Sequence, residues 1–322
     1  SRGLGDVYKR QVRLSVYCEV SMVDSIPSEY PSEYPSGNTF ASSVPVFGAN
    51  TYDATNEDVP AVSISGFVKT FGKKVAVDNL SLSIPAGSFY GLVGPNGAGK
   101  TTTIKMLTGL LMPDAGSASI FGNDVWSDVN RAKRAIGLMP QADEIFKTIT
   151  GLQLLTYAGM LREMSRAEAV RRANDLLSAF DLTEAANTMV SDYSTGMTKK
   201  ICLATAMIHS PRVLVLDEPF EAVDPVSSAN LKDILAEYVS TGGTVIISSH
   251  VMELVEKMCS HVAIINEGHV AAAGTLEEVA QGKDLEDRFM ELVGGRHAAA
   301  RIDWLNGGKS DNAPASSTNL NA

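Results

Sequence analysis

Several features are scarce or missing in this chain of 322 residues, and each absence narrows what it can be. The three cysteines, Cys18, Cys202 and Cys259, lie far apart and outside any CxxC pair. This argues against a disulfide framework or a zinc site and favours a reducing compartment. No apolar run reaches about 18 residues, so we expect no membrane-spanning helix. The N-terminal stretch carries charges and no long apolar core, so we expect no secretory signal.

Basic residues are also scarce, with 27 Lys and Arg against 37 Asp and Glu and a formal net charge of −10. A protein that binds nucleic acid mainly through phosphates needs clustered basic residues, so the balance argues against nucleic acid as the main partner. The rest of the composition, 44 % apolar and 20 % charged, is that of an ordinary globular protein. The length suits one large domain or two small ones.

The two ends differ from the middle of the chain. Residues 1–11 resemble translated sequencing-adapter sequence, so we expect residues 1–21 to be an artefact and Met22 to be the natural start. Residues 22–60 contain acidic residues, no Lys or Arg, and a repeated Ser-Glu-Tyr-Pro. We expect a disordered acidic arm there, with a tyrosine-based docking site as the alternative. Residues 293–322 are rich in Gly, Ala, Asn and Ser, and we expect a disordered tail.

Between residues 61 and 292, short apolar runs alternate with helical stretches, which predicts an α/β domain. Continuous apolar runs are typical of parallel strands buried on both faces. The expected strands are Val62–Phe67, Leu80–Ile84, Ser88–Val93, Ser117–Phe121, Ile136–Met139, Val213–Leu216, Thr244–Ile247, Val262–Asn266 and His269–Ala273. The expected helices are Lys100–Gly109, Gly151–Met164, Arg166–Phe180, Thr195–His209, Pro225–Ser240, His250–Cys259 and Leu276–Ala280. Residues 142–210 carry no strand signal, which predicts an inserted helical subdomain.

Local signals support some of these helix boundaries. Ser165 with Glu168, and Thr275 with Glu278, have the spacing of capping boxes. Pro225 suits the first turn of its helix.

The most informative motif is a glycine-rich loop that fits the pattern G-x-x-x-x-G-K-[ST]. Its residues are Gly94, Pro95, Asn96, Gly97, Ala98, Gly99, Lys100, Thr101 and Thr102. A predicted strand precedes it and a predicted helix follows, which disfavours the alternative of a chance glycine-rich turn. Glycines let backbone N–H groups surround phosphate oxygens, and the helix N-terminus adds partial positive charge. Lys100 can reach the β- and γ-phosphates, and the Thr101 hydroxyl can ligate Mg²⁺.

A second motif, Arg-Val-Leu-Val-Leu-Asp-Glu-Pro, occupies residues 212–219. A buried strand that ends in Asp217 places a carboxylate where such NTPases bind Mg²⁺. Glu218 follows directly and can polarise a water molecule as a general base. Alone this pattern is weak, but downstream of a phosphate loop it becomes informative.

With both motifs present, the sequence resembles the ATP-binding subunits of ABC transporters, and most of all the single-domain ATPases of the ABC-2 export type. The resemblance covers residues 62–292. Gly94–Thr102 corresponds to the Walker A loop, Asp217 ends Walker B, and Glu218 matches the catalytic glutamate. The resemblance implies a P-loop NTPase fold of ABC type, with a mainly parallel sheet, an antiparallel β part and an inserted helical subdomain. It also implies ATP and Mg²⁺ as ligands.

Three further positions acquire a role through the resemblance. Gln141 falls at the Q-loop, which implies a ligand for Mg²⁺ or water and a link to the transmembrane partner; otherwise it is an ordinary loop glutamine. His250 falls at the switch histidine, at the sheet edge where open α/β sheets bind ligands, and could hydrogen-bond the γ-phosphate. Phe71 matches the aromatic residue that stacks on adenine, and the alternative is a core phenylalanine. Polar neighbours around Phe71 favour the exposed position.

The signature position of the family falls at Tyr193–Met197. Ser194 and Gly196 match the usual LSGGQ form, whereas the other three positions depart from it. We expect Ser194 to cap the next helix and face an anion, and Gly196 to allow close backbone approach. In the family this helix end closes on nucleotide held by a second subunit. Asp224 matches the conserved acid of the D-loop.

The resemblance implies an ATPase that drives transport, and export in particular, through a separate permease chain. It implies a homo- or heterodimer of ATPase subunits, located in the cytoplasm on the inner face of the cell membrane. Two alternatives remain. One is a soluble ABC-family ATPase that acts on ribosomes or DNA, although the single motif set and the acidic balance disfavour it. The other is a binding-only regulatory subunit, against which Asp217 and Glu218 both argue.

Overall fold

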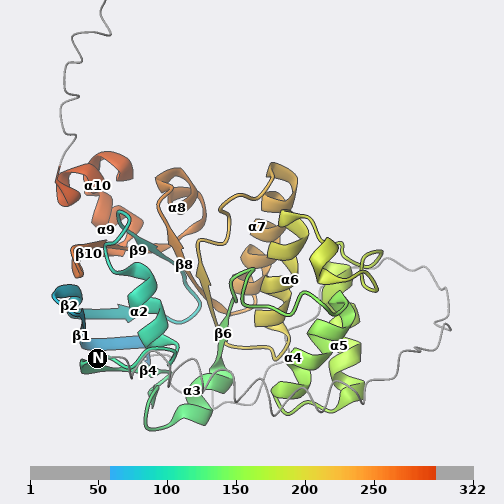
Figure 1. The fold of residues 1–322 in the computed structure, drawn as a ribbon. Coiled ribbons are helices and arrows are strands. Elements are labelled where there is room, and N and C mark those ends of the chain that lie inside the picture. The colour runs from blue at the N-terminus through green and yellow to red at the C-terminus, as the bar shows by residue number, and fades with distance from the viewer. Residues whose placement is uncertain (1–58, 295–322) are drawn as a thin grey trace, which may run out of the picture. The chain divides into compact units, whose positions relative to one another are not determined.

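The structure is a computed structural model that describes residues 59–294, drawn as the coloured ribbon in Figure 1. The expected artefact at residues 1–21 lies outside the described residues. So do nearly all of the expected arm at 22–60 and nearly all of the expected tail at 293–322.

Within the described residues the larger sheet has six strands in the order β10-β9-β3-β8-β7-β6. The strands are β3 (Phe89–Val93), β6 (Ile136–Leu138), β7 (Val213–Asp217), β8 (Thr244–Ser249), β9 (His261–Asn266) and β10 (His269–Thr275). All neighbouring pairs are parallel except β9 and β10, which are antiparallel. The central strands are continuous buried runs, as expected for a sheet covered on both faces.

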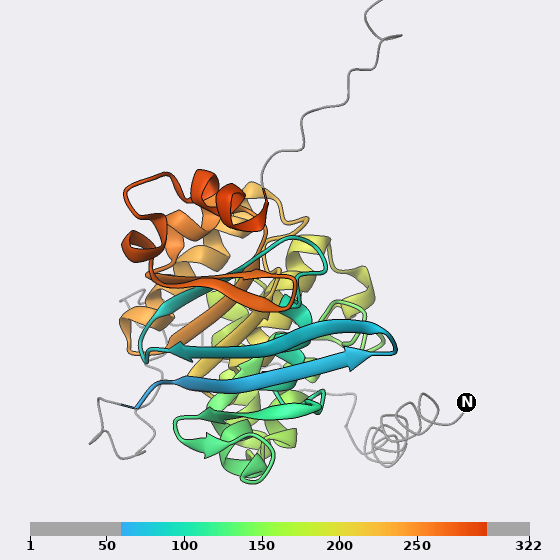
Figure 2. The same cartoon turned by 90° about the vertical axis from the view of Figure 1, so that its left-hand side faces the viewer.

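A second sheet is antiparallel, with four strands in the order β2-β1-β4-β5. These are β1 (Val62–Phe71), β2 (Lys74–Ile84), β4 (Ala115–Ile120) and β5 (Asn123–Asp124). One hydrophobic cluster joins the two sheets, with Phe67 and Leu80 from the smaller sheet, Tyr90 and Val215 from the larger, and Ile104 from α2 (Lys100–Leu107). Figure 2 shows the strands of the smaller sheet lying across the molecule beside β9 and β10. The phosphate loop, which links β3 to α2, is anchored to this core through the buried Ala98.

Helices fill the segment between β6 and β7. They are α4 (Gly151–Leu161), α5 (Arg166–Ala179) and α6 (Thr195–Met207), with a short 3₁₀ helix at Val190–Asp192. Figure 1 shows these three helices grouped together, with β6 between them and α2 in this view. An isolated bridge between Thr150 and Met189 is the β pairing recorded within this described segment. The remaining helices are α3 (Val129–Ala135), α7 (Pro225–Ser240), α8 (Met252–Met258), α9 (Leu276–Ala280) and α10 (Leu285–Val293).

The expected helix starts are mostly reproduced. Thr275 and Glu278 form the reciprocal capping box at α9. Ser165 accepts from the Glu168 N–H at α5, but the Glu168 carboxylate binds Arg171 and Arg172 instead of returning to the cap, so only half of that box forms. Competition from two guanidinium groups explains the difference, because a charged donor binds a carboxylate more strongly than a backbone N–H does. A full capping box at Thr150, which the sequence analysis missed, starts α4.

Most boundaries lie within a few residues of those expected, and two of the differences have local reasons. Strand β2 begins at Lys74 rather than Leu80, and Asn79 within it adopts φ 49 where the β1–β2 register shifts. Helix α8 begins at Met252 rather than His250, because the Val251 N–H donates to the Ser249 hydroxyl and keeps the chain extended. The seven-residue α3 and the nine-residue α10 were not expected, since so few turns leave little helical period to detect. Among the described helices, none has the length and apolar character needed to cross a membrane.

Candidate functional site

The phosphate loop leaves β3 and enters α2 through glycines whose backbone angles or close contacts disfavour a side chain. Gly97 and Gly99 adopt φ 82 and φ 110, in the left-handed region that disfavours side chains. A Cβ on Gly94 would lie 2.3 Å from the Ile265 carbonyl oxygen, and one on Gly99 would lie 2.6 Å from the Ala76 oxygen. The loop is also tied from behind, because the Gly268 N–H donates to the Ala98 carbonyl at 2.9 Å. Contacts with the surrounding strands therefore hold the phosphate loop in its conformation.

Lys100 occupies the interior of this loop. Its side chain is almost fully covered, with a residue exposure of 7 %, and Nζ donates to the Gly94 oxygen at 2.7 Å and the Pro95 oxygen at 3.3 Å. Burial lowers the pKa of the ammonium, while the charges of Glu218 and Asp217 oppose that shift. A positive charge surrounded by backbone carbonyls is well placed to exchange them for phosphate oxygens. The N–H groups of Lys100, Thr101 and Thr102 in the first turn of α2 lack intrahelical acceptors and add donors.

Thr101 and Asp217 meet at the mouth of the loop. The Thr101 hydroxyl donates to Asp217 Oδ2 at 2.9 Å, although 116 residues separate the two in sequence. Among the described residues, no group of three or more His, Cys, Asp or Glu forms a metal cage. Mg²⁺ in phosphate-transfer sites takes one or two protein oxygens and completes its shell with phosphate and water, so a hydroxyl beside one carboxylate fits it.

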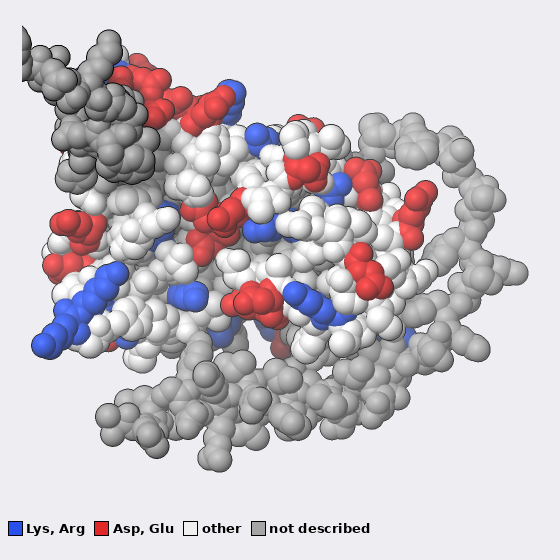
Figure 3. Space-filling view, turned by 45° about the horizontal axis from the view of Figure 1, so that its top comes forward, with Lys and Arg blue, Asp and Glu red and all other residues white. Residues whose placement is uncertain are grey.

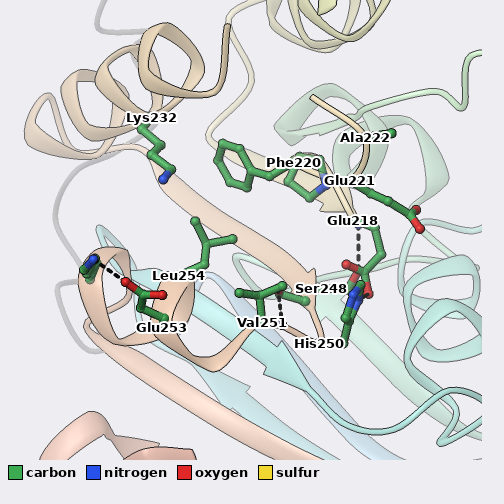
Figure 4. A pocket seen from close by; sticks show the side chains of 13 residues that line it. Glu218, Phe220, Glu221, Ala222, Lys232, Ser248, His250, Val251, Glu253 and Leu254 are labelled. Carbon is green, nitrogen blue, oxygen red and sulfur yellow. Dashed lines mark hydrogen bonds and ion pairs between the residues drawn. The ribbon is translucent and has the colours of Figure 1, made fainter. Parts of the chain in front are cut away.

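Glu218 follows Asp217 in a strained turn at the end of β7. Its φ is 48, and its N–H donates to the Ser248 hydroxyl at 2.9 Å. Its Oε1 lies 3.1 Å from His250 Nδ1, as the dashed contact in Figure 4 shows. Its carbonyl accepts from Lys199 Nζ of α6 at 3.3 Å. The structure thus joins Glu218 and His250, which the sequence analysis expected to share a site, and adds Ser248 and Lys199.

A pocket of about 430 Å³ adjoins the Glu218–His250 pair. Figure 4 shows Phe220 and Leu254 on opposite walls and Lys232 pointing toward the space between them. The Lys232 ammonium lies 5.7 Å from the centre of the Phe220 ring. Water and solutes can therefore approach the carboxylate from this side.

The expected signature residues form a second group of contacts with the loop after β7. Ser194 caps α6 by accepting from the Met197 N–H at 3.2 Å. A Cβ on Gly196 would lie 2.7 Å from the Ser227 hydroxyl and 2.8 Å from an Asp224 oxygen, so a side chain there would displace both groups. Asp224 caps α7. The hydrogen bond from the Ser227 N–H is the largest of the contacts that lower the pKa of the Asp224 carboxyl group. The signature segment around Gly196 and the D-loop around Asp224 therefore pack against each other within one chain.

Phe71 ends strand β1, and Gln141 lies in the loop that follows strand β6. Phe71 is the last residue of β1 and is 50 % exposed, so the core alternative is wrong. The Lys69 ammonium lies 5.9 Å from its ring centre. Gln141 is exposed in the loop after β6, and its N–H donates to Glu144 at 3.0 Å. Strands β6 and β7 are parallel neighbours, so Gln141, which follows β6, lies at the same carboxyl-terminal edge of the sheet as Asp217, which ends β7.

Ser248 and Lys199 are the site residues that sequence reasoning missed. No local pattern marks either of them, because their contacts join residues 30 and 19 positions apart. The available signal was the position of Ser248 near the end of an apolar strand that His250 follows, where a buried hydroxyl needs a partner.

The chain is similar to a large family of known proteins. The family model described as ABC transporter matches residues 77–221. A daunorubicin/doxorubicin resistance ATP-binding protein of Streptomyces peucetius is 38 % identical over 68 % of this chain and 66 % of its own length. A daunorubicin resistance ATP-binding protein of Streptomyces coeruleorubidus is 34 % identical over 77 % of this chain and 79 % of its own length. A Nod factor export ATP-binding protein of Burkholderia orbicola is 35 % identical over 76 % and 80 %.

Solved structures agree with these relatives. An ATP-binding subunit of an ABC transporter superposes with a TM-score of 0.67 at 27 % identity, over 72 % of this chain and 99 % of the solved chain. A dimeric ATP-binding cassette in a post-hydrolysis state, bound to ADP and phosphate, has the same fold with a TM-score of 0.62 at 23 % identity, over 67 % and 98 %. The shared fold explains why the phosphate loop, the Asp217–Glu218 pair and the signature helix occur together here. The chain belongs to the ATP-binding subunits of ABC transporters.

Proposed function

We propose that this chain binds and hydrolyses ATP to power export through a separate transmembrane permease. The observation that carries the proposal is the junction of the Thr101–Asp217 pair with the Glu218–His250 pair, directly beside a preformed phosphate loop. Family membership supports ATP as the nucleotide. The roles of the individual residues follow from their positions.

The phosphate loop would bind the nucleotide, with Lys100 and the first-turn N–H groups of α2 donating to the β- and γ-phosphates. Thr101 and Asp217 would hold Mg²⁺, assisted by Gln141, and the bound ion supplies charge that offsets the negative charge of the phosphates. Phe71 would stack on the adenine, because its ring is exposed at the end of β1.

Glu218 would accept a proton from the water that attacks the γ-phosphate. His250 contacts Glu218 Oε1, so it would orient the carboxylate and can hydrogen-bond the phosphate. Ser194 and Gly196 would approach the γ-phosphate on a second subunit, where Asp224 lines the same contact. The dimeric relative with bound ADP and phosphate supports this arrangement by fold.

We assign residues 61–292 to the ATPase domain and residues 142–210 to its helical subdomain, which would contact the permease. The named functions of the relatives, drug resistance and Nod factor export, support export as the direction. A location in the cytoplasm on the inner membrane face follows from coupling to a permease. Figure 3 shows acidic and basic side chains interspersed over the face in view, which favours this function over action on ribosomes or DNA.

Exchange of Glu218 for glutamine tests the proposal. Glu218→Gln keeps the shape of the side chain but removes the base, so we expect ATP turnover to fall about a hundredfold or more. Glu221→Gln is the matched control, because Glu221 is an exposed glutamate in the same loop. Phosphate release by the purified chain measures both variants. Normal steady-state hydrolysis by Glu218→Gln would refute the assigned base.

A further inference from the structure

Ser248 holds two of the proposed reactive groups with one hydroxyl. It lies near the end of β8, fully buried, and pairs in register with Asp217 of the parallel neighbour β7. Its Oγ donates to Asp217 Oδ1 at 2.5 Å and accepts from the Glu218 N–H at 2.9 Å. A serine hydroxyl has one proton to donate. The carboxylate can only accept and the N–H can only donate, so Ser248 must donate to Asp217 and accept from Glu218.

The first contact fixes the rotation of the Asp217 carboxylate. With Oδ1 bound to Ser248, Oδ2 faces the Thr101 hydroxyl at 2.9 Å. Without the serine, the carboxylate could turn about its terminal bond, since such torsions have broad minima. Ser248 therefore determines which carboxylate oxygen is presented to the mouth of the phosphate loop.

The second contact holds the backbone of Glu218. Its φ of 48 lies in the left-handed region, which non-glycine residues adopt rarely and keep only where their surroundings fix it. The hydrogen bond to Ser248 fixes the N–H side of this residue, and Lys199 fixes its carbonyl. The side chain can then extend toward His250.

We propose that Ser248 is a positioning residue for ATP hydrolysis: it orients Asp217 and Glu218 together without itself touching the nucleotide. This inference rests on the proposed function of Glu218 and Asp217. The competing explanation is that Ser248 only satisfies buried polar groups and stabilises the sheet. The two explanations differ in what happens to turnover when the protein remains folded.

Ser249 provides a matched control. It is the next residue of the same strand, is equally buried at 2 % exposure, and its hydroxyl accepts from the Val251 N–H at 3.0 Å. Ser249→Ala removes the same atom from β8 but leaves Asp217 and Glu218 untouched. Any general disturbance of the strand should affect both variants alike.

The experiment compares Ser248→Ala, Ser249→Ala and the unmodified chain in ATP hydrolysis, with thermal unfolding to verify folding. For Ser248→Ala we expect kcat to fall about ten- to a hundredfold and KM for ATP to rise by less, about three- to tenfold, because hydrogen bonds to charged groups are lost and Asp217 is oriented less well, while no direct contact with the nucleotide is removed. For Ser249→Ala we expect kcat within about threefold of the unmodified chain. If Ser248→Ala does not fold, Ser248→Cys, which fills the site with a weaker donor, takes its place with the same expectation.

Binding supplies a readout that does not depend on turnover. A fluorescent ATP analogue is titrated with and without Mg²⁺. We expect Ser248→Ala to keep the metal-free affinity but to lose at least about threefold of the gain that Mg²⁺ produces, since Asp217 is no longer oriented. A structural role alone would lower the unfolding temperature and leave this gain unchanged.

Three results would overturn the inference. They are a kcat for Ser248→Ala within about twofold of the unmodified chain, an equal loss in Ser249→Ala, and an unaltered Mg²⁺ effect on analogue binding. If the unmodified chain hydrolysed no ATP, the proposed function would fail instead, and the binding titration would still decide the role of Ser248.

Discussion

At the scale of single residues, the site depends on contacts made before any nucleotide arrives. Lys100 donates to two carbonyls of its own loop, and Asp217 accepts from both Thr101 and Ser248. The sequence predicted the glycines, Lys100, Asp217 and Glu218 because each belongs to a short pattern with a chemical meaning. It could not predict Ser248 or Lys199, because their roles arise only when distant segments meet.

Removal of the Lys100 ammonium should weaken nucleotide binding. We expect Lys100→Ala to raise the dissociation constant for ATP about tenfold to a hundredfold, the range for lost hydrogen bonds to charged groups. Lys105→Ala, at an exposed lysine on the same helix, is the control. Calorimetric titration measures both, and unchanged binding by Lys100→Ala would contradict the phosphate-loop assignment.

At the scale of elements, the end of α6 is joined to β6 through a buried imidazole. His209 Nε2 lies 3.0 Å from the Ile136 oxygen, and Nδ1 is buried without a hydrogen-bond partner among the described residues. The two elements also pack closely here, since a Cβ on Gly137 would lie 2.2 Å from the Ala206 oxygen. Sequence patterns predicted both elements but not their junction, because the imidazole has no motif around it.

Burial lowers the pKa of His209 to about 4 from an ordinary value of 6.5, and the charges of Arg162 and Arg172 act in the same direction. The folded protein therefore favours neutral imidazole. The neutral His209 imidazole contributes to the unfolding free energy in full above about pH 6.5. This contribution, roughly 3 kcal/mol in total, is lost as the pH falls toward 4.

Urea unfolding between pH 7 and pH 4 measures this effect. We expect His209→Gln to lose less unfolding free energy over that interval than the unmodified chain does. Parallel curves for His209→Gln and the unmodified chain would show that the imidazole binds protons equally in the folded and unfolded states, which would contradict the lowered pKa.

At the scale of the whole molecule, the alternation of strands and helices was enough to predict an α/β domain, and the family motifs predicted its type. The packing of the antiparallel sheet against the parallel one could not be predicted from periodicity. Residues such as Phe67 and Tyr90 lie in one core only because the chain brings two sheets together. Because the signature differs from LSGGQ at three positions, the sequence likewise did not predict how Gly196 packs against Asp224.

Dimerisation is the prediction that belongs to this scale. We expect Glu218→Gln with ATP and Mg²⁺ to elute as a dimer in size-exclusion chromatography and as a monomer without nucleotide, because bound ATP would be shared by two chains. Adding Ser194→Ala should weaken that dimer about tenfold, as expected when a hydrogen bond to a charged group is lost.

Ser165→Ala is the control for the dimer experiment, since Ser165 caps α5 with the same hydrogen-bond geometry but has no expected place at the interface. Equal dimer loss in both serine variants would attribute the effect to helix capping. Dimer loss confined to Ser194→Ala would locate the nucleotide contact at the start of α6.

Two polar residues near the start of helix α6, Ser194 and Lys199, have different proposed or observed partners. Ser194, which caps the N-terminus of α6, is exposed and is proposed to contact the nucleotide of a neighbouring chain, while Lys199, five residues and about 7.5 Å along the axis, donates to the carbonyl of the chain's own Glu218. A rigid rod of this length cannot shift at one end and stay still at the other. If Ser194 contacts that nucleotide as proposed, a shift of α6 on nucleotide binding would also move the Glu218 carbonyl, and we therefore expect the two nucleotide sites of a dimer to influence each other's hydrolysis.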